Sequence, residues 1–327
     1  MGRSSVTFGG GAFYEPVLTE MCKTGEMPST VRIAQLSDTH FAEEEAEAEG
    51  GFAYDTSGAF DAVLAHLGDH DHLDLVVVTG DIADHGRPAQ YRRAAEAFAR
   101  FTVPVNVCPG NHDNAMAYTV GMGRPGVSTS RVVSLGAWTF VFVDSNTGVM
   151  LDGDAGLPVD PPGEQRLHSN GLLSAMEVEW IRQVANNADT EHVFLWLHHP
   201  PLVPLGMFDN AHYDQQWLSL LADLPMVRGL GGGHTHIPAE YEVAGRPVFV
   251  APSLKHNFSM EPQSWLPPGY RTFAFEADGS ITSETHLVDD ERWPRRPFGR
   301  LLKSLFDGEI THQEMADIVA RRSLPGQ

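Results

Sequence analysis

The sequence has few cysteines and few cationic residues. Of its 327 residues only two are cysteines, and 22 Lys and Arg stand against 43 Asp and Glu, a formal net charge of −21. Two cysteines are too few for a disulfide framework, and Cys108, at the end of an apolar run, is predicted to be a reduced core residue. The negative charge repels nucleic acids and anionic membranes at long range. We therefore expect no polymeric nucleic-acid partner.

Long apolar runs are also missing. No N-terminal stretch resembles a signal peptide, and no run is long enough to span a bilayer. Val6 stands where a myristoylation signal would need Ser or Thr. These absences predict a cytoplasmic protein without a membrane partner. Gly and Pro, in contrast, are plentiful, and the hydrophobic share of 42% suits a globular enzyme rich in turns.

From Val31 onward, short apolar runs alternate with segments of helical spacing. This alternation predicts a largely parallel sheet covered by helices. After Gly126 the pattern changes to neighbouring strands and hairpins, one of which carries the turn signal Asp278-Gly279. Two mixed β-sheets with helices outside would accommodate both patterns. The predicted fold class is α/β, a four-layer α/β/β/α sandwich of two mixed β-sheets flanked by helices.

Three regions are expected along the chain. Residues 1–30 are rich in Gly and Ser and are predicted to be an N-terminal arm, residues 31–288 to be the main domain, and residues 289–327 to be a helical C-terminal extension. The extension combines a basic patch with a capping box at Thr311–Glu314, which opens a helix through Arg321. We interpret it as a packing or oligomerisation element, and the formation of a homodimer is one possibility left open. The acidic run Glu43–Glu49 is interpreted as a solvated loop insertion.

Five short blocks of metal-binding side chains are spread through the main domain, each just after a run that is typical of a buried strand. The strands are predicted at Val31–Leu36, Leu75–Thr79, Val103–Cys108, Val193–Leu197 and Met226–Leu230. The blocks that follow them are Asp38-Thr39-His40, Gly80-Asp81-Ile82-Ala83-Asp84, Gly110-Asn111-His112-Asp113, His198-His199-Pro200-Pro201 and Gly233-His234-Thr235-His236.

Each block alone has an ordinary structural explanation. An Asp-x-His sequence occurs by chance, and Gly-Asp at a strand end can be a turn. Together, however, the blocks supply Asp, Asn and His without a thiolate, the ligand types suited to Zn, Mn, Fe or Co. Strand ends that direct such groups to the same side can form one site. The blocks therefore predict a dinuclear metallohydrolase.

The order of these blocks resembles the signature of the calcineurin-like metallophosphoesterases, over about residues 31–255. Finer features are similar to the class III cyclic nucleotide phosphodiesterases: Leu36–His40, Thr79–Asp84, Leu197–Pro201 and Val248–Leu254. The N-terminal arm, the Glu43–Glu49 insertion and the tail beyond about residue 290 depart from the family pattern. The resemblance implies the calcineurin-like fold and two divalent or mixed-valence metal ions per chain, with Mn, Fe, Zn and Co all left open.

The resemblance also implies roles for individual residues. Asp81 would bridge the two ions, and a hydroxide shared by the ions would attack phosphorus. The other implied ligands are Asp38, His40 and His236 for the first ion, and Asn111, His198 and His234 for the second. His198 is chosen over His199 because the family pattern is His-x-Pro. His112 would protonate the leaving oxygen, and Asp113 would orient its ring.

Further residues are expected to support the site or to contact substrate. Asp84 is expected to support its loop through hydrogen bonds, whereas His85 is interpreted as an ordinary loop residue. Asn111, His112, His199 and His256 are the candidate substrate contacts. For His256 and Asn257 two interpretations stay open, a contact with a nucleoside or sugar and an ordinary surface loop.

The predicted activity is hydrolysis of a small phosphodiester, and the leading candidate substrate is 3′,5′-cyclic AMP or a related cyclic nucleotide. A broad-specificity phosphodiesterase or phosphomonoesterase, acting for example on glycerophosphodiesters, is the alternative. A catalytically inactive binding scaffold is the alternative of another class. All seven implied ligands and His112 are present in the sequence, which favours an enzyme.

Overall fold

The computed structural model describes residues 29–42, 55–68, 72–123, 125–148, 171–205, 210–293 and 295–311, together with residues 314, 315 and 318. Most of the predicted N-terminal arm, the run Glu43–Glu49 and most of the helix predicted from Thr311 lie outside the described residues. Cys22 lies outside them too. Among the helices that are described, none has both the length and the apolar character needed to cross a membrane.

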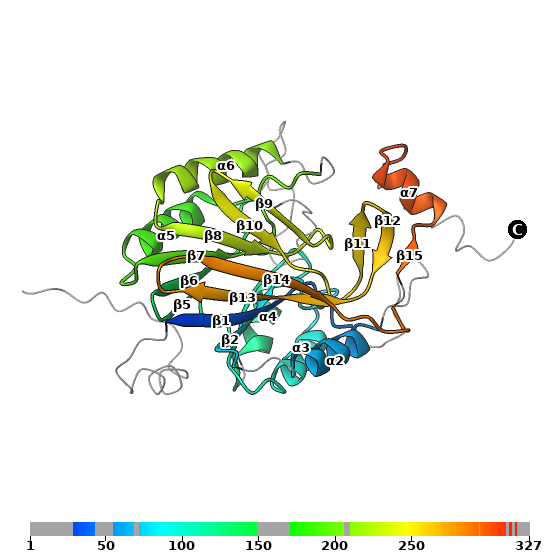
Figure 1. Cartoon of the computed structure of the whole chain (residues 1–327), viewed down its shortest axis with the longest axis horizontal. Coiled ribbons are helices and arrows are strands. Elements are labelled where there is room, and N and C mark those ends of the chain that lie inside the picture. Colours follow the sequence, from blue (N-terminus) through cyan, green and yellow to red (C-terminus); the bar gives the residue numbers. More distant parts are fainter. Residues whose placement is uncertain are drawn as a thin grey trace, which may run out of the picture.

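Two six-stranded sheets pack face to face in the centre of the molecule (Figure 1). The first has the strand order β14 (Ile281–Leu287), β13 (Gly269–Glu276), β1 (Thr30–Leu36), β2 (Leu75–Thr79), β3 (Val105–Cys108), β4 (Val127–Ser128). The second has the order β5 (Val132–Leu135), β6 (Trp138–Phe142), β7 (His192–Trp196), β8 (Val227–Gly232), β10 (Arg246–Val250), β9 (Ala239–Val243). Both contain parallel and antiparallel pairs. The predicted fold class is confirmed.

The strands form where apolar residues are continuous. All five residues of β2 are buried, and so are all five of β7, as expected for strands covered on both faces. Between the sheets lies an aromatic core that includes Trp138, Phe194 and Phe275. Burial of such side chains contributes about 1.5–3 kcal/mol each. Cys108 is a free, buried member of the same core, as predicted.

Helices cover the outer face of each sheet. The core beyond the first sheet is formed with α2 (Thr56–Leu67), α3 (Pro88–Phe98) and α4 (Ala115–Met122), and the core beyond the second with α5 (Ala175–Asn186) and α6 (Ala211–Asp223). The side chain of Asp55 caps α2, and Pro88 occupies the first turn of α3, where its missing N–H costs nothing. Helical spacing in the sequence predicts four of these helices, at Ala59–Leu67, Pro88–Phe101, Ser174–Asn187 and His212–Ala222, but it does not predict α4.

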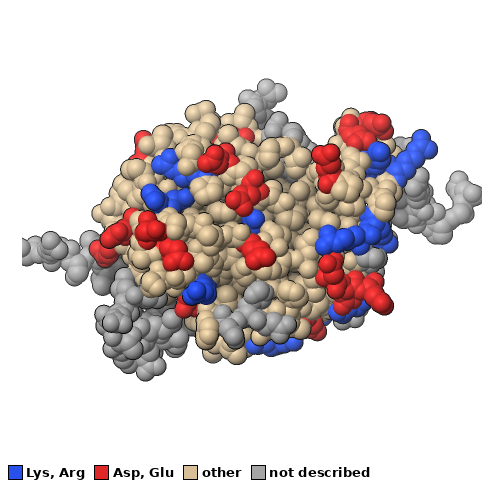
Figure 2. Space-filling model, viewed as in Figure 1, with Lys and Arg blue, Asp and Glu red and all other residues tan. Residues whose placement is uncertain are grey.

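A third, smaller sheet lies beside the sandwich (Figure 1). It contains β11 (Asn257–Met260), β12 (Gln263–Leu266) and β15 (Arg296–Pro297), and α7 (Arg300–Phe306) packs against it. Because β15 pairs with β12, residues on both sides of the predicted boundary at residue 288 share this sheet. The extension is also not purely helical, since it begins with this strand. Figure 2 shows both basic and acidic side chains over this side of the molecule. Arg292 pairs with Asp290, and Arg295 pairs with Asp289.

Candidate metal centre

The five polar blocks meet at one end of the two sheets. β1, β2 and β3 are parallel in the first sheet, and β7 and β8 are parallel in the second, so the loops that follow them lie at their carboxyl ends. Hydrogen bonds join these loops directly. The N–H of Asp38 donates to the Gly80 carbonyl oxygen at 3.1 Å, and that of His40 to the Asp81 carbonyl oxygen at 2.8 Å. The predicted convergence of the blocks is therefore present.

Five residues of the blocks have left-handed backbone conformations. Their φ angles are 53° at Asp38, 42° at His40, 49° at Asp81, 68° at His234 and 55° at His236. For residues other than glycine, such conformations cost on the order of 1–3 kcal/mol each and persist where the surrounding structure enforces them. Their concentration in these loops is typical of a functional site.

Asp38, His40 and His236 form a first group that is close enough to share one cation. Nε2 of His236 lies 3.2 Å from Oδ1 of Asp38, and Asp38 is fully buried. Asp81 connects this group to the next. Its Oδ2 lies 3.5 Å from Nε2 of His40 and 3.3 Å from Nε2 of His198.

The second group contains Asn111 and three histidines. Oδ1 of Asn111 lies 3.1 Å from Nε2 of His198 and 3.2 Å from Nε2 of His199, and the ring of His234 is 4.4 Å from that of His199. His199 thus belongs to the same cation-competent set as His198 and His234. Nδ1 of His198 meets the Thr79 carbonyl oxygen at 2.8 Å, which directs its Nε2 into the site.

The donor atoms fit a pair of metal ions. Nε2 of His40 is buried and has no hydrogen-bond partner among the described residues, and such an atom is costly unless a ligand satisfies it. The loops also approach one another too closely for larger residues. A Cβ at Gly233 would collide with Ser37 and Asp38, and a Cβ at Gly80, where φ is +82°, would collide with His198. Both glycines are needed to bring the side chains together.

The histidines differ in charge before an ion binds. Burial lowers the pKa of His40 to about 4, assisted by the ammonium of Lys255, and burial lowers that of His234 to about 3. Both rings are therefore neutral near pH 7, ready to bind metal. Burial also opposes a charge on His198, but the carboxylates of Asp81 and Asp38 outweigh it and raise its pKa to about 9. A metal ion at His198 would displace a proton.

His112 lies beside the first group, and its orientation corrects one prediction. Its Nδ1 lies 2.7 Å from the backbone carbonyl oxygen of Asp84, to which it donates, and its Nε2 lies 4.0 Å from Oδ2 of Asp81. The expected contact between the ring and Asp113 is wrong. The carboxylate of Asp113 instead accepts hydrogen bonds from the backbone N–H groups of Gly110 and Ala83, among others, and from the hydroxyl of Tyr91. Asp113 holds the loops, and Asp84 orients the ring.

Comparison with known proteins identifies the family. Residues 31–238 match the model of the calcineurin-like phosphoesterases, and this stretch covers more than half of the chain. The chain belongs to this family. Calcineurin-like phosphoesterases are metal-dependent enzymes, and the two groups that meet at Asp81 are where such ions can bind.

Similar sequences are phosphodiesterases by name. The chain is 32% identical over 276 residues to the 3′,5′-cyclic adenosine monophosphate phosphodiesterase CpdA of Escherichia coli, covering 80% of this chain and 92% of that one. It is 27% identical to a probable cyclic nucleotide phosphodiesterase of Synechococcus, covering 80% and 94%. It is also 28% identical to the glycerophosphodiester phosphodiesterase GpdQ of Enterobacter lignolyticus, covering 62% and 70%.

Solved structures share the fold at low sequence identity. A dimetal phosphatase from Danio rerio superposes with a TM-score of 0.52 at 17% identity, covering 79% of this chain and 99% of that one. GAP50, the anchor in the inner membrane complex of Plasmodium, superposes with a TM-score of 0.54 at 12% identity, covering 80% and 86%. These likenesses concern the fold, and the activity of this phosphoesterase has to be argued from its site.

Several residues around the site have contacts that sequence reasoning missed. The hydroxyl of Ser145 meets Nδ1 of His199 at 2.8 Å, and the ammonium of Lys255 meets Oδ1 of Asp84 at 2.6 Å. The same oxygen of Asp84 lies 2.9 Å from Nδ1 of His40, so the supporting role expected for Asp84 is confirmed. Ser145 and Lys255 carry no signal in the sequence, because each resembles an ordinary polar residue after a strand.

The two candidates that follow β10 have different surroundings. The ring of His256 lies 4.6 Å from that of His236, at the edge of the first group. Asn257 is fully buried, and its side-chain amide bonds the backbone of Ser253 and Pro267. Asn257 therefore stabilises the turn and is not available to a substrate.

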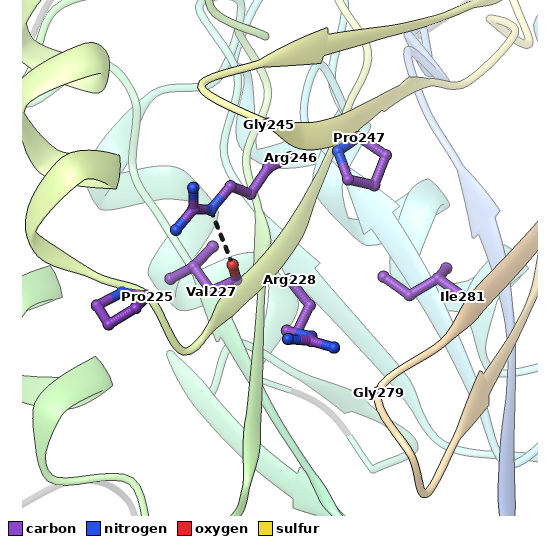
Figure 3. A pocket seen from close by; sticks show the side chains of 8 residues that line it. All are labelled: Pro225, Val227, Arg228, Gly245, Arg246, Pro247, Gly279 and Ile281. Atoms are coloured by element: carbon purple, nitrogen blue, oxygen red, sulfur yellow. Dashed lines mark hydrogen bonds between the residues drawn. The ribbon is translucent and has the colours of Figure 1, made fainter.

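A hollow of about 430 Å³ lies at the end of β8 opposite the polar blocks, near the β13–β14 turn (Figure 3). Arg228 and Arg246 line it, and Arg246 donates to the Val227 carbonyl oxygen at 3.2 Å. The strand directions place this hollow at the amino ends of β8 and β10, whereas the histidines of the blocks follow their carboxyl ends. It plays no part in the site of the phosphoesterase.

Proposed function

We propose that the chain is a dinuclear metallophosphoesterase that hydrolyses small phosphodiesters, with 3′,5′-cyclic AMP or a related cyclic nucleotide as substrate. The observation that carries the proposal is the position of Oδ2 of Asp81, between Nε2 of His40 at 3.5 Å and Nε2 of His198 at 3.3 Å. A carboxylate in such a position can serve two cations at once. The relation to CpdA supports the choice of substrate.

We assign the ligands in two sets that share Asp81. The first ion would be held by Asp38, His40 and His236, and the second by Asn111, His198 and His234. His199 supports this arrangement, because its Nε2 can donate to the oxygen of Asn111 and fix the amide. Ions suited to such nitrogen and oxygen ligands are Mn, Fe, Zn and Co.

The ions, when bound, would lower the pKa of a water molecule and offset the charge of the phosphate oxygens. The residues of the chain then position the reaction. The Nδ1–H of His112 is held by the Asp84 carbonyl oxygen, so Nε2 is the atom that faces the site. A protonated ring can transfer its Nε2 proton to the leaving oxygen. The His112 side chain is 33% exposed, which leaves it accessible to a substrate.

The small and anionic character of the substrate fits the surroundings. The net charge of −21 disfavours long nucleic acids, whereas bound ions attract a small phosphate locally. The proposed substrate contacts remain Asn111, His112, His199 and His256. The ring distance of 4.6 Å between His256 and His236 supports assigning His256 to the part of the substrate beyond the phosphate. A cytoplasmic location and a homodimer stay predictions.

The proposal is tested with purified protein stripped by a chelator and reloaded with Mn²⁺. Its substrates are cyclic AMP, cyclic GMP, 2′,3′-cyclic AMP, bis(p-nitrophenyl) phosphate and p-nitrophenyl phosphate. We expect no turnover without metal, and kcat/KM highest for a 3′,5′-cyclic nucleotide. Full activity after exhaustive metal removal would overturn the proposal.

A glycerophosphodiesterase is the second candidate, because the chain is also similar to GpdQ. Glycerophosphocholine added to the same assay distinguishes the two. A higher kcat/KM for this diester than for any cyclic nucleotide would favour the second candidate. Binding of cyclic nucleotide without turnover, in protein loaded with two ions, would favour the scaffold.

A further inference from the structure

Lys255 connects the turn after β10 to the loop after β2. Its ammonium lies 2.6 Å from Oδ1 of Asp84, a residue 171 positions earlier in the chain. The same carboxylate oxygen lies 2.9 Å from Nδ1 of His40. The side chains are 27% exposed at Lys255, 10% at Asp84 and 3% at His40. One oxygen therefore links an ammonium at the rim of the site to a buried histidine inside it.

Asp84 holds a second ring as well. Its backbone carbonyl oxygen accepts the hydrogen bond from Nδ1 of His112 at 2.7 Å. The rings of His40 and His112 are in edge-to-face contact, with centroids 4.7 Å apart. A shift of Asp84 would consequently displace both the ring assigned to the first ion and the ring assigned to the leaving group.

Asp84 has a cationic partner in this position, the ammonium of Lys255. Its other oxygen, Oδ2, is 3.7 Å from Nδ1 of His85, which is beyond hydrogen-bonding distance. Asp84 also lies close enough to His40 and His112 for the three to attract a cation of their own. The ammonium of Lys255 supplies positive charge there, and it keeps the shared oxygen engaged as a hydrogen-bond acceptor.

The turn that carries Lys255 is fixed by its own hydrogen bonds. The N–H of Lys255 donates to the hydroxyl oxygen of Ser253 at 2.9 Å, and that hydroxyl donates to the Asp38 carbonyl oxygen at 3.3 Å. The next residue, His256, packs its ring against His236. Because the backbone is already ordered, only the conformational entropy of the Lys255 side chain remains to be lost when the ammonium bonds Asp84.

We propose that Lys255 is a positioning residue of the phosphoesterase. Its ammonium holds Asp84 so that Nε2 of His40 faces the metal pair and Nε2 of His112 faces the leaving oxygen. This inference rests on the ligand assignment of the proposed function, but not on the identity of the substrate.

The first test measures metal binding without substrate. Lys255→Met removes the ammonium and retains most of the length of the side chain, and Lys255→Arg retains the charge. Lys303→Met, at an exposed position of α7, is the control. Loss of a nearby positive charge by itself would strengthen cation binding, whereas loss of orientation weakens it. We expect Lys255→Met to bind one of two Mn²⁺ ions about tenfold more weakly. This is the lower end of the loss in affinity that is usual when a residue supporting a metal ligand is replaced. Lys255→Arg should recover most of the affinity, and Lys303→Met should equal the wild type.

The second test separates positioning from substrate binding. At saturating Mn²⁺, Lys255→Met should lower kcat for cyclic AMP about tenfold with little change in KM, and less for bis(p-nitrophenyl) phosphate, whose leaving group needs no proton. Lys255→Met should also add no further loss when it is introduced into Asp84→Asn. The inference would be overturned if the kcat losses of Lys255→Met and Asp84→Asn multiplied in the double variant. An effect of Lys255→Met on KM alone, or tighter Mn²⁺ binding by this variant, would also overturn it.

The two proposals can fail separately. A wild-type protein that binds two Mn²⁺ ions but turns over no cyclic nucleotide refutes the proposed substrate, and the metal-binding test of Lys255 still supports or overturns the inference. A wild type that binds no Mn²⁺ pair overturns both.

Discussion

The two groups of the candidate metal centre, called its first and second halves below, hold their side chains in different ways. The first half has a carboxylate of its own, Asp38, and its His40 is backed by the charged pair of Asp84 and Lys255. The second half has the neutral amide of Asn111, and its His198 and His199 are backed by the Thr79 carbonyl and the Ser145 hydroxyl.

This difference predicts unequal ions. A metal ion in the first half would have more negative charge around it and should bind more tightly. The ion in the second half would keep more of its positive charge for an anionic substrate. Asp81, which lies between the halves, should matter equally to both.

Replacing Asp81 should abolish both ion sites at once, so we expect it to have the largest effect on metal binding and activity. Asp81→Asn is preferable to Asp81→Ala, because asparagine tolerates the left-handed backbone at this position, where φ is 49°. Loss of the shared charge should release both ions and lower kcat/KM by more than about 10³-fold. Metal analysis after dialysis and steady-state kinetics measure the two effects. Two tightly held ions with normal turnover would show that Asp81 is not the bridge. Asp223→Asn, at an exposed position of α6, is the control.

His112→Ala should leave both halves intact and impair the proton transfer. The variant should retain two ions but lose about 10²–10⁴-fold in kcat for a cyclic nucleotide, whose alkoxide leaves poorly. The loss should be smaller for bis(p-nitrophenyl) phosphate. His212→Ala, on the exposed surface of α6, serves as the control. Equal losses on both substrates would mean that His112 only positions the phosphoryl group, and a lost ion would make it a ligand.

Asn111→Asp sharpens the comparison, because it gives the second half a carboxylate. The added charge should tighten the weaker of the two Mn²⁺ sites by at least about tenfold, since one unit charge near a cation contributes a few kcal/mol even at an effective dielectric constant of 20. The same charge should raise KM for an anionic diester. Calorimetric titration of the chelator-treated protein measures the binding. An unchanged weaker site would place Asn111 outside the metal centre.

The sequence predicted the two large sheets and the convergence of the five blocks, because both depend on local patterns. Buried strands such as β2 are continuous apolar runs, and polar residues at the ends of parallel strands must meet at one edge. The small sheet was not predicted, because its strands lack such local patterns. β15 has only two residues, and β12 shows no alternation of buried and exposed positions. Likewise α4 has no clear apolar stripe, and Met116 and Val120 on it are exposed.

Within the site, residue types were easier to predict than their contacts. The family resemblance implied a proton-donor role for His112, but the partner of its Nδ1 is a backbone carbonyl, which every residue carries. Lys255 reaches Asp84 across 171 positions, so only the folded chain brings them together. The left-handed conformations of His40 and His234 are likewise imposed by tertiary contacts, because histidine does not require them.

The smallest expected effect concerns the pH dependence of stability in the second half. Burial opposes the charge on His198, but Asp81 and Asp38 raise its pKa from the ordinary 6.5 to about 9. Between these values the folded metal-free protein binds a proton that the unfolded chain has released. The contribution of His198 to the free energy of unfolding is therefore fully present below pH 6.5 and declines as the pH rises toward 9, by at most about 1.4 kcal/mol per pH unit for one proton.

A bound ion takes the place of that proton, so protein loaded with Mn²⁺ should lack this decline. Urea unfolding at pH 6.5, 7.5 and 8.5, with and without chelator, measures the difference. Metal-free His198→Gln is the control, since it has no proton to lose and should show a flatter profile than the metal-free wild type. Equal pH profiles for the metal-free wild type and this variant would show that His198 is not protonated at neutral pH. The two halves would then both start from neutral histidines and differ only in their carboxylates.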